Sequence, residues 1–180
     1  MLRLALIAPL FLAMAAYAQD AAPASHAPRP IDYHKLMEVF RQKLLDMPRS
    51  NCDGDTIAVE RFNLPQASAT YGQNGENMPH VLVEISDYAD FANVKRIADA
   101  MAAWRNVKID KQTGNGFERT LTIAGHPAFE TYQIDRKTAE LQILVATRYL
   151  VSVGASNISA EQLRRLAEEL PIAKLADLKS

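Results

Sequence analysis

Four short stretches of alternating apolar and polar residues follow one another in the second half of the sequence. They cover residues 117–123, 128–134, 140–145 and 149–153. Gly125-His126-Pro127 separates the first two stretches, and residues 135–138 (DRKT) separate the next two. An alternation of period two buries one face of each strand, and strands joined by tight turns pair with their chain neighbours. We therefore predict an antiparallel meander, which restricts the fold to a sheet with one face covered.

The other patterned segments are two further strands and three helices. Strands are predicted at residues 56–62 and 80–86. Helices are predicted over residues 32–47 and 90–105, with Asp32 and Asp90 as N-caps, and a third begins at the capping box Ser159-Ala-Glu-Gln162. Apolar side chains at helical spacing predict which residues each helix buries. The predicted stripes are Tyr33, Leu36, Met37, Phe40 and Leu44; Val94, Ile97, Ala98 and Met101; and Leu163, Leu166, Ala167 and Leu170.

These elements predict a single α+β domain over residues 32–180. In it, an antiparallel sheet of about five to six strands is covered by three helices. A chain of this length can bury enough apolar surface for one core, and its single cysteine, Cys52, forms no internal disulfide. The 20 Lys and Arg residues and 21 Asp and Glu residues are scattered along the chain. Such a balance offers no basic patch for nucleic acid or an anionic membrane, so neither is predicted as a partner.

The N-terminus has the three parts of a secretory signal peptide. Arg3 precedes an apolar run over residues 4–16, and Ala16-Tyr17-Ala18 provides the small side chains that signal peptidase requires. The run would make about 20 Å of helix, too short for a bilayer core of about 30 Å. We predict a signal peptide at residues 1–18, a flexible Ala- and Pro-rich tether at residues 19–31, and a soluble periplasmic or secreted protein without stable membrane insertion.

An order of elements in the second half resembles that of a known family. The elements are the turn Gly125-x-Pro127, a strand carrying Tyr132, the strands ELQILV (140–145) and RYLVSV (148–153), and a capped helix followed by LADL (175–178). Over roughly residues 56–180 the chain resembles the small exported proteins of the PsbP-like fold, including the periplasmic DcrB-like branch. The resemblance implies an accessory or binding module rather than an enzyme, and it implies no particular functional residues.

Residues that could carry catalysis are few. The four histidines, at positions 26, 34, 80 and 126, form no H-x-x-x-H or H-x-H pair, so no metal clamp is predicted. Asn51-x-Asp53-x-Asp55 has the oxygen spacing that opens a calcium loop, but Thr56 and Phe62 stand where that loop needs Gly and Glu. We interpret residues 50–55 as a turn, with Gly54 at a positive φ, and Cys52 as buried and inert.

We therefore predict a non-enzymatic binding or accessory module without metal or cofactor, which recognises a protein partner or a small ligand. Residues 63–79 form a polar segment that is long for a loop, and long loops of compact domains are often functional. The candidate binding residues are Tyr71, Asn74 and His80, with Tyr71 as the anchor. The alternative is an exported hydrolase or metal-dependent enzyme that uses Cys52, Asp53 and Asp55 with a histidine brought near by folding.

Overall fold

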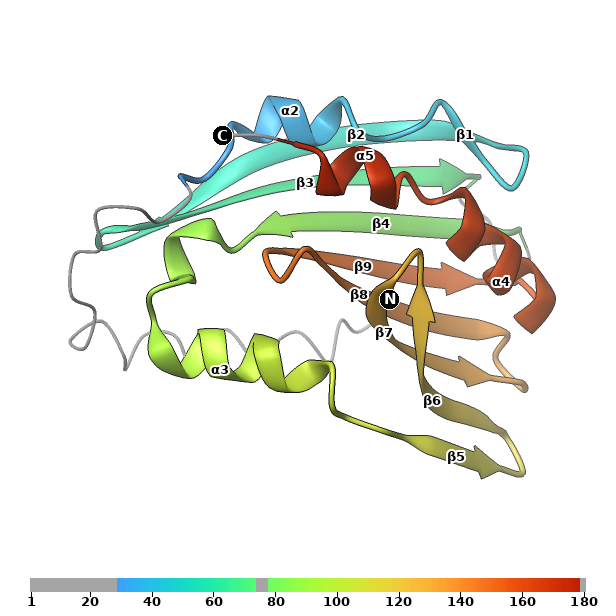
Figure 1. The fold of residues 1–180 in the computed structure, drawn as a ribbon. Coiled ribbons are helices and arrows are strands. Elements are labelled where there is room, and N and C mark those ends of the chain that lie inside the picture. The colour runs from blue at the N-terminus through green and yellow to red at the C-terminus, as the bar shows by residue number, and fades with distance from the viewer. Residues whose placement is uncertain (1–28, 74–77, 179–180) are drawn as a thin grey trace.

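Nine strands form one antiparallel sheet in the computed structural model, which describes residues 29–73 and 78–178 (Figure 1). The strands are β1 (Lys43–Leu44), β2 (Met47–Val59), β3 (Phe62–Gly72), β4 (His80–Asp87), β5 (Asp110–Thr113), β6 (Gly116–Ile123), β7 (His126–Gln133), β8 (Thr138–Val145) and β9 (Tyr149–Ser156). Their order across the sheet is β1-β2-β3-β4-β9-β8-β7-β6-β5. The last five strands are therefore consecutive neighbours, which confirms the predicted meander.

The helices are divided between the two faces of this sheet. They are α2 (Tyr33–Met37), the 3₁₀ helix η1 (Ala89–Phe91), α3 (Lys95–Trp104), α4 (Ala160–Glu169) and α5 (Ile172–Ala176). Buried residues of α2, α4 and α5 pack on one face, which we call the helical face. η1 and the start of α3 pack on the opposite face, which we call the open face (Figure 1).

The predicted sheet of about five to six strands covered by three helices is wrong. Residues 47–55, expected as a helix end and a turn, belong to the long strand β2. Residues 63–72, expected as part of a loop, lie in β3 and pair with β2 from Arg49–Tyr71 to Val59–Phe62. The exposed positions of this hairpin carry Asn, Asp and Ser, residues that are typical of turns in a sequence. In β2 and β3 these polar residues alternate with residues on the covered face. This alternation is the pattern of a strand, and it outweighs the turn-like composition.

The helix predicted over residues 32–47 ends after little more than one turn. The Asp32 side chain caps it as expected, by accepting a hydrogen bond from the His34 backbone N–H at 2.9 Å. The chain then turns into β1, and Phe40 and Leu44 still reach the core. Gly54 of β2 does not have the positive φ that was predicted. It instead makes room for α2, because a Cβ atom there would lie 2.6 Å from Cδ2 of Tyr33.

The helix predicted over residues 90–105 is also shorter and begins later. Asp90 lies in η1, where its carboxylate accepts a hydrogen bond from the Asn63 backbone N–H at 2.7 Å instead of capping α3. α3 has no buried residue, and Ile97 and Met101 of its predicted stripe are only partly buried against the small cluster on the open face. The buried residues of this segment, Phe91 and Val94, both precede the helix.

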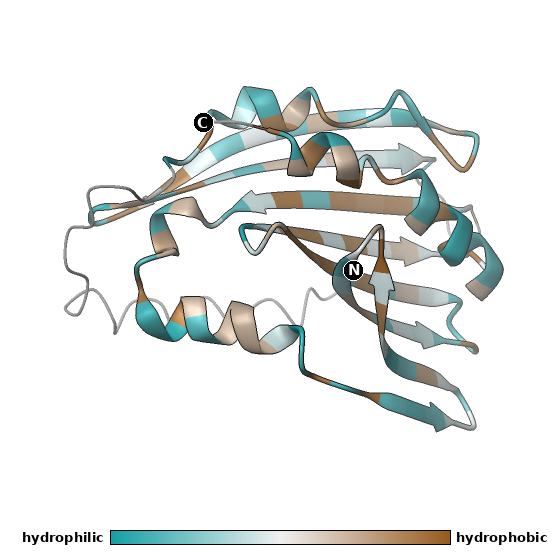
Figure 2. Cartoon of the chain, viewed as in Figure 1, coloured by the Kyte–Doolittle hydropathy of each residue, from teal (hydrophilic) through white to brown (hydrophobic). Residues whose placement is uncertain are grey.

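The main core lies on the helical face. Every second residue of β3, β4, β8 and β9 points to this face and packs against the apolar stripes of α4 and α5. Hydrophobic residues are dense along β4 and β9 in the middle of the sheet, whereas the edge strand β5 is hydrophilic (Figure 2). The capping box of α4 is present, since Gln162 N–H donates to Ser159 Oγ at 3.1 Å and Ser159 N–H donates to Gln162 Oε1 at 2.7 Å.

The predicted signal peptide at residues 1–18, and nearly all of the predicted tether, lie outside the described residues. Within residues 29–73 and 78–178, none of the helices has the length and hydropathy to cross a bilayer. Arg29, Pro30 and Ile31 of the predicted tether are described, and Ile31 is buried in the main core.

Candidate functional site

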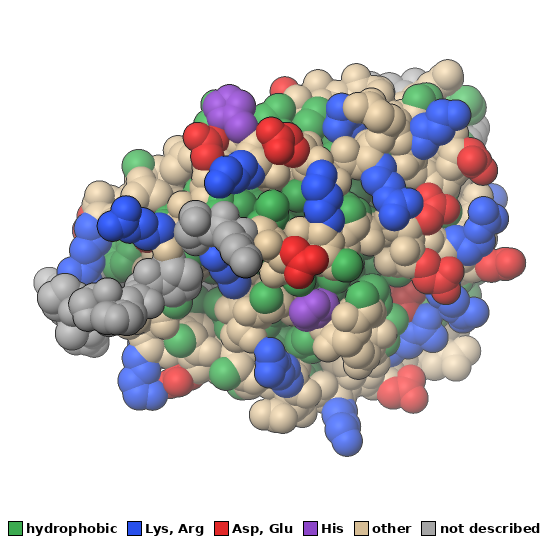
Figure 3. Space-filling view, turned by 45° about the horizontal axis from the view of Figure 1, so that its top comes forward, with side chains coloured by type: hydrophobic (Ala, Val, Ile, Leu, Met, Phe, Trp, Pro, Cys, Tyr) green, Lys and Arg blue, Asp and Glu red, His purple; other side chains and the backbone are tan. Residues whose placement is uncertain are grey.

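An open groove of about 980 Å³ lies on the helical face. Three segments far apart in the sequence line it: the turn at residues 38–42, the tip of the β6–β7 hairpin at residues 121–124, and the junction of α4 with α5 at residues 164–174. On this face, hydrophobic surface remains visible between Lys or Arg and Asp or Glu side chains (Figure 3). The groove is therefore a hollow in which the helices leave part of the core uncovered.

The floor of the groove is the break between α4 and α5. Leu170 has the extended dihedral angles φ −61° and ψ 137°, and Pro171 has no N–H with which to continue the helix. The Leu170 N–H still closes α4 on Leu166 O at 3.1 Å, and Ile172 N–H donates to Leu170 O at 2.8 Å. Because the chain changes direction here, Leu170, Pro171 and Ile172 present carbon atoms to the groove.

One wall is the turn between α2 and β1. The hydroxyl of buried Tyr71 donates a hydrogen bond to the Arg41 carbonyl at 3.1 Å. The Lys174 ammonium of α5 donates to the Glu38 carbonyl. Phe40, 6% exposed, inserts between these two anchor points and contributes the aromatic part of the lining. The backbone of this wall is therefore fixed to both the sheet and α5.

The opposite wall is the tip of the β6–β7 hairpin. Ile123 and His126 are the last paired residues, so Ala124 and Gly125 form a two-residue turn. Both have positive φ, 48° and 82°, which is the conformation that matches the twist of an antiparallel hairpin. The tight turn holds Leu121 and Ile123 against the groove.

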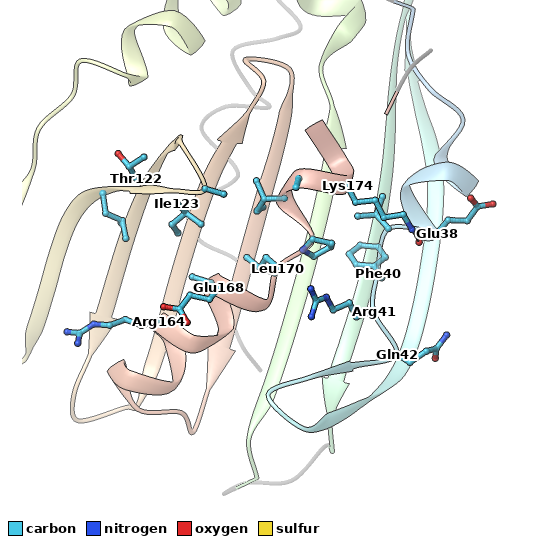
Figure 4. Close-up of a pocket in the computed structure, with 17 residues that line it drawn as sticks. Glu38, Phe40, Arg41, Gln42, Thr122, Ile123, Arg164, Glu168, Leu170 and Lys174 are labelled. Atoms are coloured by element: carbon cyan, nitrogen blue, oxygen red, sulfur yellow. Dashed lines mark hydrogen bonds between the residues drawn. The ribbon is translucent and has the colours of Figure 1, made fainter. Parts of the chain in front are cut away.

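Five charged side chains line the groove. They are Glu38, Arg41, Arg164, Glu168 and Lys174. The guanidinium of Arg41 extends towards Leu170, whereas Glu38 points away from the hollow and Arg164 and Glu168 lie together at its far end (Figure 4). The described lining holds neither His nor Cys, and its chemistry is that of apolar contact with one inward cation. Such a lining suits the binding of a ligand.

Tyr71 and His80, two of the predicted binding residues, lie in the sheet. Tyr71 is in β3 and is 2% exposed, and burial raises the pKa of its phenol to about 12. Its role in the structure is to hold the Arg41 carbonyl from below, so its ring does not form an exposed anchor. His80 begins β4, half-buried, opposite Gly72 and Ser156. Asn74 lies outside the described residues.

The residues of the enzyme alternative are separated by the alternation of β2. Cys52 pairs with Ala69 and packs against the main core, while Asp53 and Asp55 are exposed on the other face of the strand. Burial raises the pKa of the Cys52 thiol, which is the opposite of what a thiolate nucleophile needs. In the part of the chain that the structure describes, no group of three or more His, Cys, Asp or Glu side chains is placed to hold a metal ion.

A second hollow, of about 360 Å³, lies on the open face beside these aspartates. Its lining combines polar residues, among them Gln66, Ser86 and Glu84, with the apolar side chains of Tyr88 and Leu150. The Gln66 amide donates to Ser86 Oγ at 3.2 Å. Partial burial raises the pKa of the Glu84 carboxyl. This hollow combines carboxylates and hydroxyls, and its volume is less than half that of the groove.

Comparison of the chain with protein-family models, curated proteins and solved structures found no match. The resemblance to PsbP-like proteins therefore stays a prediction, and the site must be judged by its geometry.

Sequence reasoning missed the groove, although one of its signals was present. Pro171 directly follows the last residue of the predicted stripe, and a proline there ends the helix and creates the floor. No local pattern distinguishes Arg41 from the other arginines, because its importance depends on the β6–β7 tip, which is 80 residues away in the sequence.

Proposed function

We propose that the protein is an exported, non-enzymatic binding module that accepts an apolar ligand in the groove. The observation that carries this proposal is the composition of the lining, where Leu170 and Ile172 of the floor and Phe40 of one wall belong to the core and border an open hollow. Small-molecule sites are typically concave and mostly apolar, with a few polar groups that fix the orientation of the ligand.

The size of the groove favours a small ligand over a protein partner. Its volume of about 980 Å³ is at the upper end of the range of roughly 300–1,000 Å³ that ligand sites occupy. Export to the periplasm or the exterior is proposed from the signal-peptide pattern of residues 1–18. An accessory role is in keeping with the resemblance of the second half to PsbP-like proteins.

A neutral fluorescent probe tests the proposal. N-phenyl-1-naphthylamine should gain fluorescence when it is titrated with residues 19–180, because an apolar site removes it from water. Ala173→Trp should weaken probe binding at least tenfold, since Ala173 is an exposed residue of α5 that lines the groove and the indole would cover part of its apolar surface. Ala103→Trp is the matched control, because Ala103 is an exposed alanine of α3 outside the groove.

Two results would contradict the proposal. One is a wild-type protein that leaves the probe fluorescence unchanged. The other is an Ala173→Trp protein that melts like the wild type and binds the probe as tightly.

A further inference from the structure

The charges around the groove differ in what they can offer to a ligand. The Lys174 ammonium is engaged by the Glu38 carbonyl. Arg164 is turned to the far end of the groove, next to Glu168 (Figure 4). Arg41 is the cation whose charged group extends over the apolar floor. The centre of the groove therefore combines carbon surface with a single guanidinium.

Arg41 is available to an anion. Among the residues that the structure describes, its guanidinium makes neither an ion pair nor a hydrogen bond, in contrast to Arg119 and Arg148. Its backbone is nevertheless fixed, because the Tyr71 hydroxyl holds its carbonyl and Phe40 beside it is buried. A guanidinium on a fixed backbone presents two parallel N–H donors, which match the two oxygens of a carboxylate.

We propose that the groove binds a single-chain amphiphile with a terminal carboxylate, whose head group is held by Arg41 and whose alkyl chain lies on the floor. This inference rests on the proposed function and specifies its ligand. An alkyl chain needs no hydrogen-bond partner, whereas a peptide would bring about two backbone polar groups per residue into contact with Leu170, Pro171 and Ile172.

The number of positive charges that point into the groove favours a carboxylate head group over a phosphate. A phosphate monoester carries a charge between about −1.5 and −2 at neutral pH and three acceptor oxygens, so it favours a cluster of cations. Here one guanidinium points inwards, and the two other cations of the lining are turned away or engaged. One carboxylate and one guanidinium neutralise each other.

The test is displacement of bound N-phenyl-1-naphthylamine by decanoate and decyl phosphate, each below its micellar concentration, and by 1-decanol below its solubility limit. Decanoate should bind the wild-type protein roughly tenfold or more tightly than decanol, as a charge-assisted bidentate contact predicts. Arg41→Gln should abolish this preference, because the neutral amide gives decanoate no counterion. Arg165→Gln, which removes an exposed arginine of α4 outside the groove, should leave the preference intact.

The outcomes separate the inference from the function on which it rests. If neither decanoate nor decanol displaces the probe, the proposed function fails together with the inference. If both displace it equally, or if Arg41→Gln retains the preference, the carboxylate head group is overturned while the apolar groove stands. Tighter binding of decyl phosphate, or of an apolar hexapeptide with a free C-terminus, would overturn the assignment of the ligand to a carboxylate amphiphile.

Discussion

Asp87 is fully buried, and its replacement should be the most destabilising polar substitution of the sheet. Its Oδ1 accepts hydrogen bonds from Arg148 Nε at 2.8 Å and from the Ala89 N–H at 3.0 Å. Its Oδ2 accepts from Arg148 Nη2 at 2.7 Å and from the Ile31 N–H at 2.9 Å. The same Nη2 atom donates to the Arg29 carbonyl at 2.9 Å, so one carboxylate joins the N-terminal segment, β4 and the turn before β9.

Asp87→Asn keeps the volume and removes the charge. One carboxylate oxygen becomes an NH₂ group, which cannot accept the N–H hydrogen bonds made to that oxygen. The Arg148 side chain, which is 14% exposed, also loses its counterion. Removing one partner of a buried ion pair costs about 3–5 kcal/mol, because the other charge stays buried. For a domain of this size about 1 kcal/mol corresponds to roughly 2–4 °C, so the melting temperature should fall by about 10 °C.

Thermal and urea unfolding followed by circular dichroism would measure this loss. The matched control is Asp99→Asn, which breaks the exposed pair with Lys95 on α3. Exposed i,i+4 pairs contribute about 0.3–0.5 kcal/mol, so this control should melt within about 2 °C of the wild type. If Asp87→Asn loses less than about 1 kcal/mol, the ion pair does not hold these three segments together and the reasoning is refuted.

Two further substitutions test the packing of the sheet. Gly54→Ala should lower the free energy of unfolding by about 1–3 kcal/mol in urea titrations, because the added Cβ would approach Tyr33 Cδ2 to 2.6 Å. Gly154→Ala is the control. Its added Cβ would meet nothing within 4 Å, so it should be neutral or slightly stabilising. Burial raises the pKa of Glu84 in the folded state, so the folded protein binds more protons there and loses stability as the pH rises from the unfolded towards the folded pKa. Glu84→Gln should therefore raise the melting temperature at pH 7.5 but not at pH 3.5. The control Glu140→Gln, at an exposed position, should show no such pH-dependent gain. If Glu84→Gln changes the melting temperature equally at both pH values, the raised pKa of Glu84 does not affect stability.

The meander was predictable because the residues that define each strand and each turn are close together in the sequence. Residues 117–153 alternate, and Gly125 and residues 135–138 mark two of the turns, so pairing between chain neighbours follows from the sequence. The capping box at Ser159 and the break at Pro171 were predictable for the same reason. In each case the side chains that define the element lie within a few residues of one another.

The β2–β3 hairpin was not predictable, because its signal is divided between distant segments. Asn51, Asp53 and Asp55 indicate a turn when they are considered alone. They lie in a strand because Cys52 and Gly54, which alternate with them and point to the opposite face, are covered by the main core and α2. Tyr71 was assigned to a loop for the same reason, and the acceptor of its hydroxyl, the Arg41 carbonyl, lies 30 residues earlier in the chain.

The candidate site shows why composition alone could not find the binding residue. Arg119 lies directly opposite Glu130 in the β6–β7 pairing, and its Nε donates to that buried carboxylate at 2.6 Å. Arg148 is bound to Asp87 in a similar way. In both cases a buried carboxylate of a strand neutralises the arginine, so its charge serves the fold. Arg41 lies in a turn that faces the tip of a hairpin, where strand pairing supplies no carboxylate. Its charge is therefore available to a ligand, and this difference arises only when the nine strands are in register.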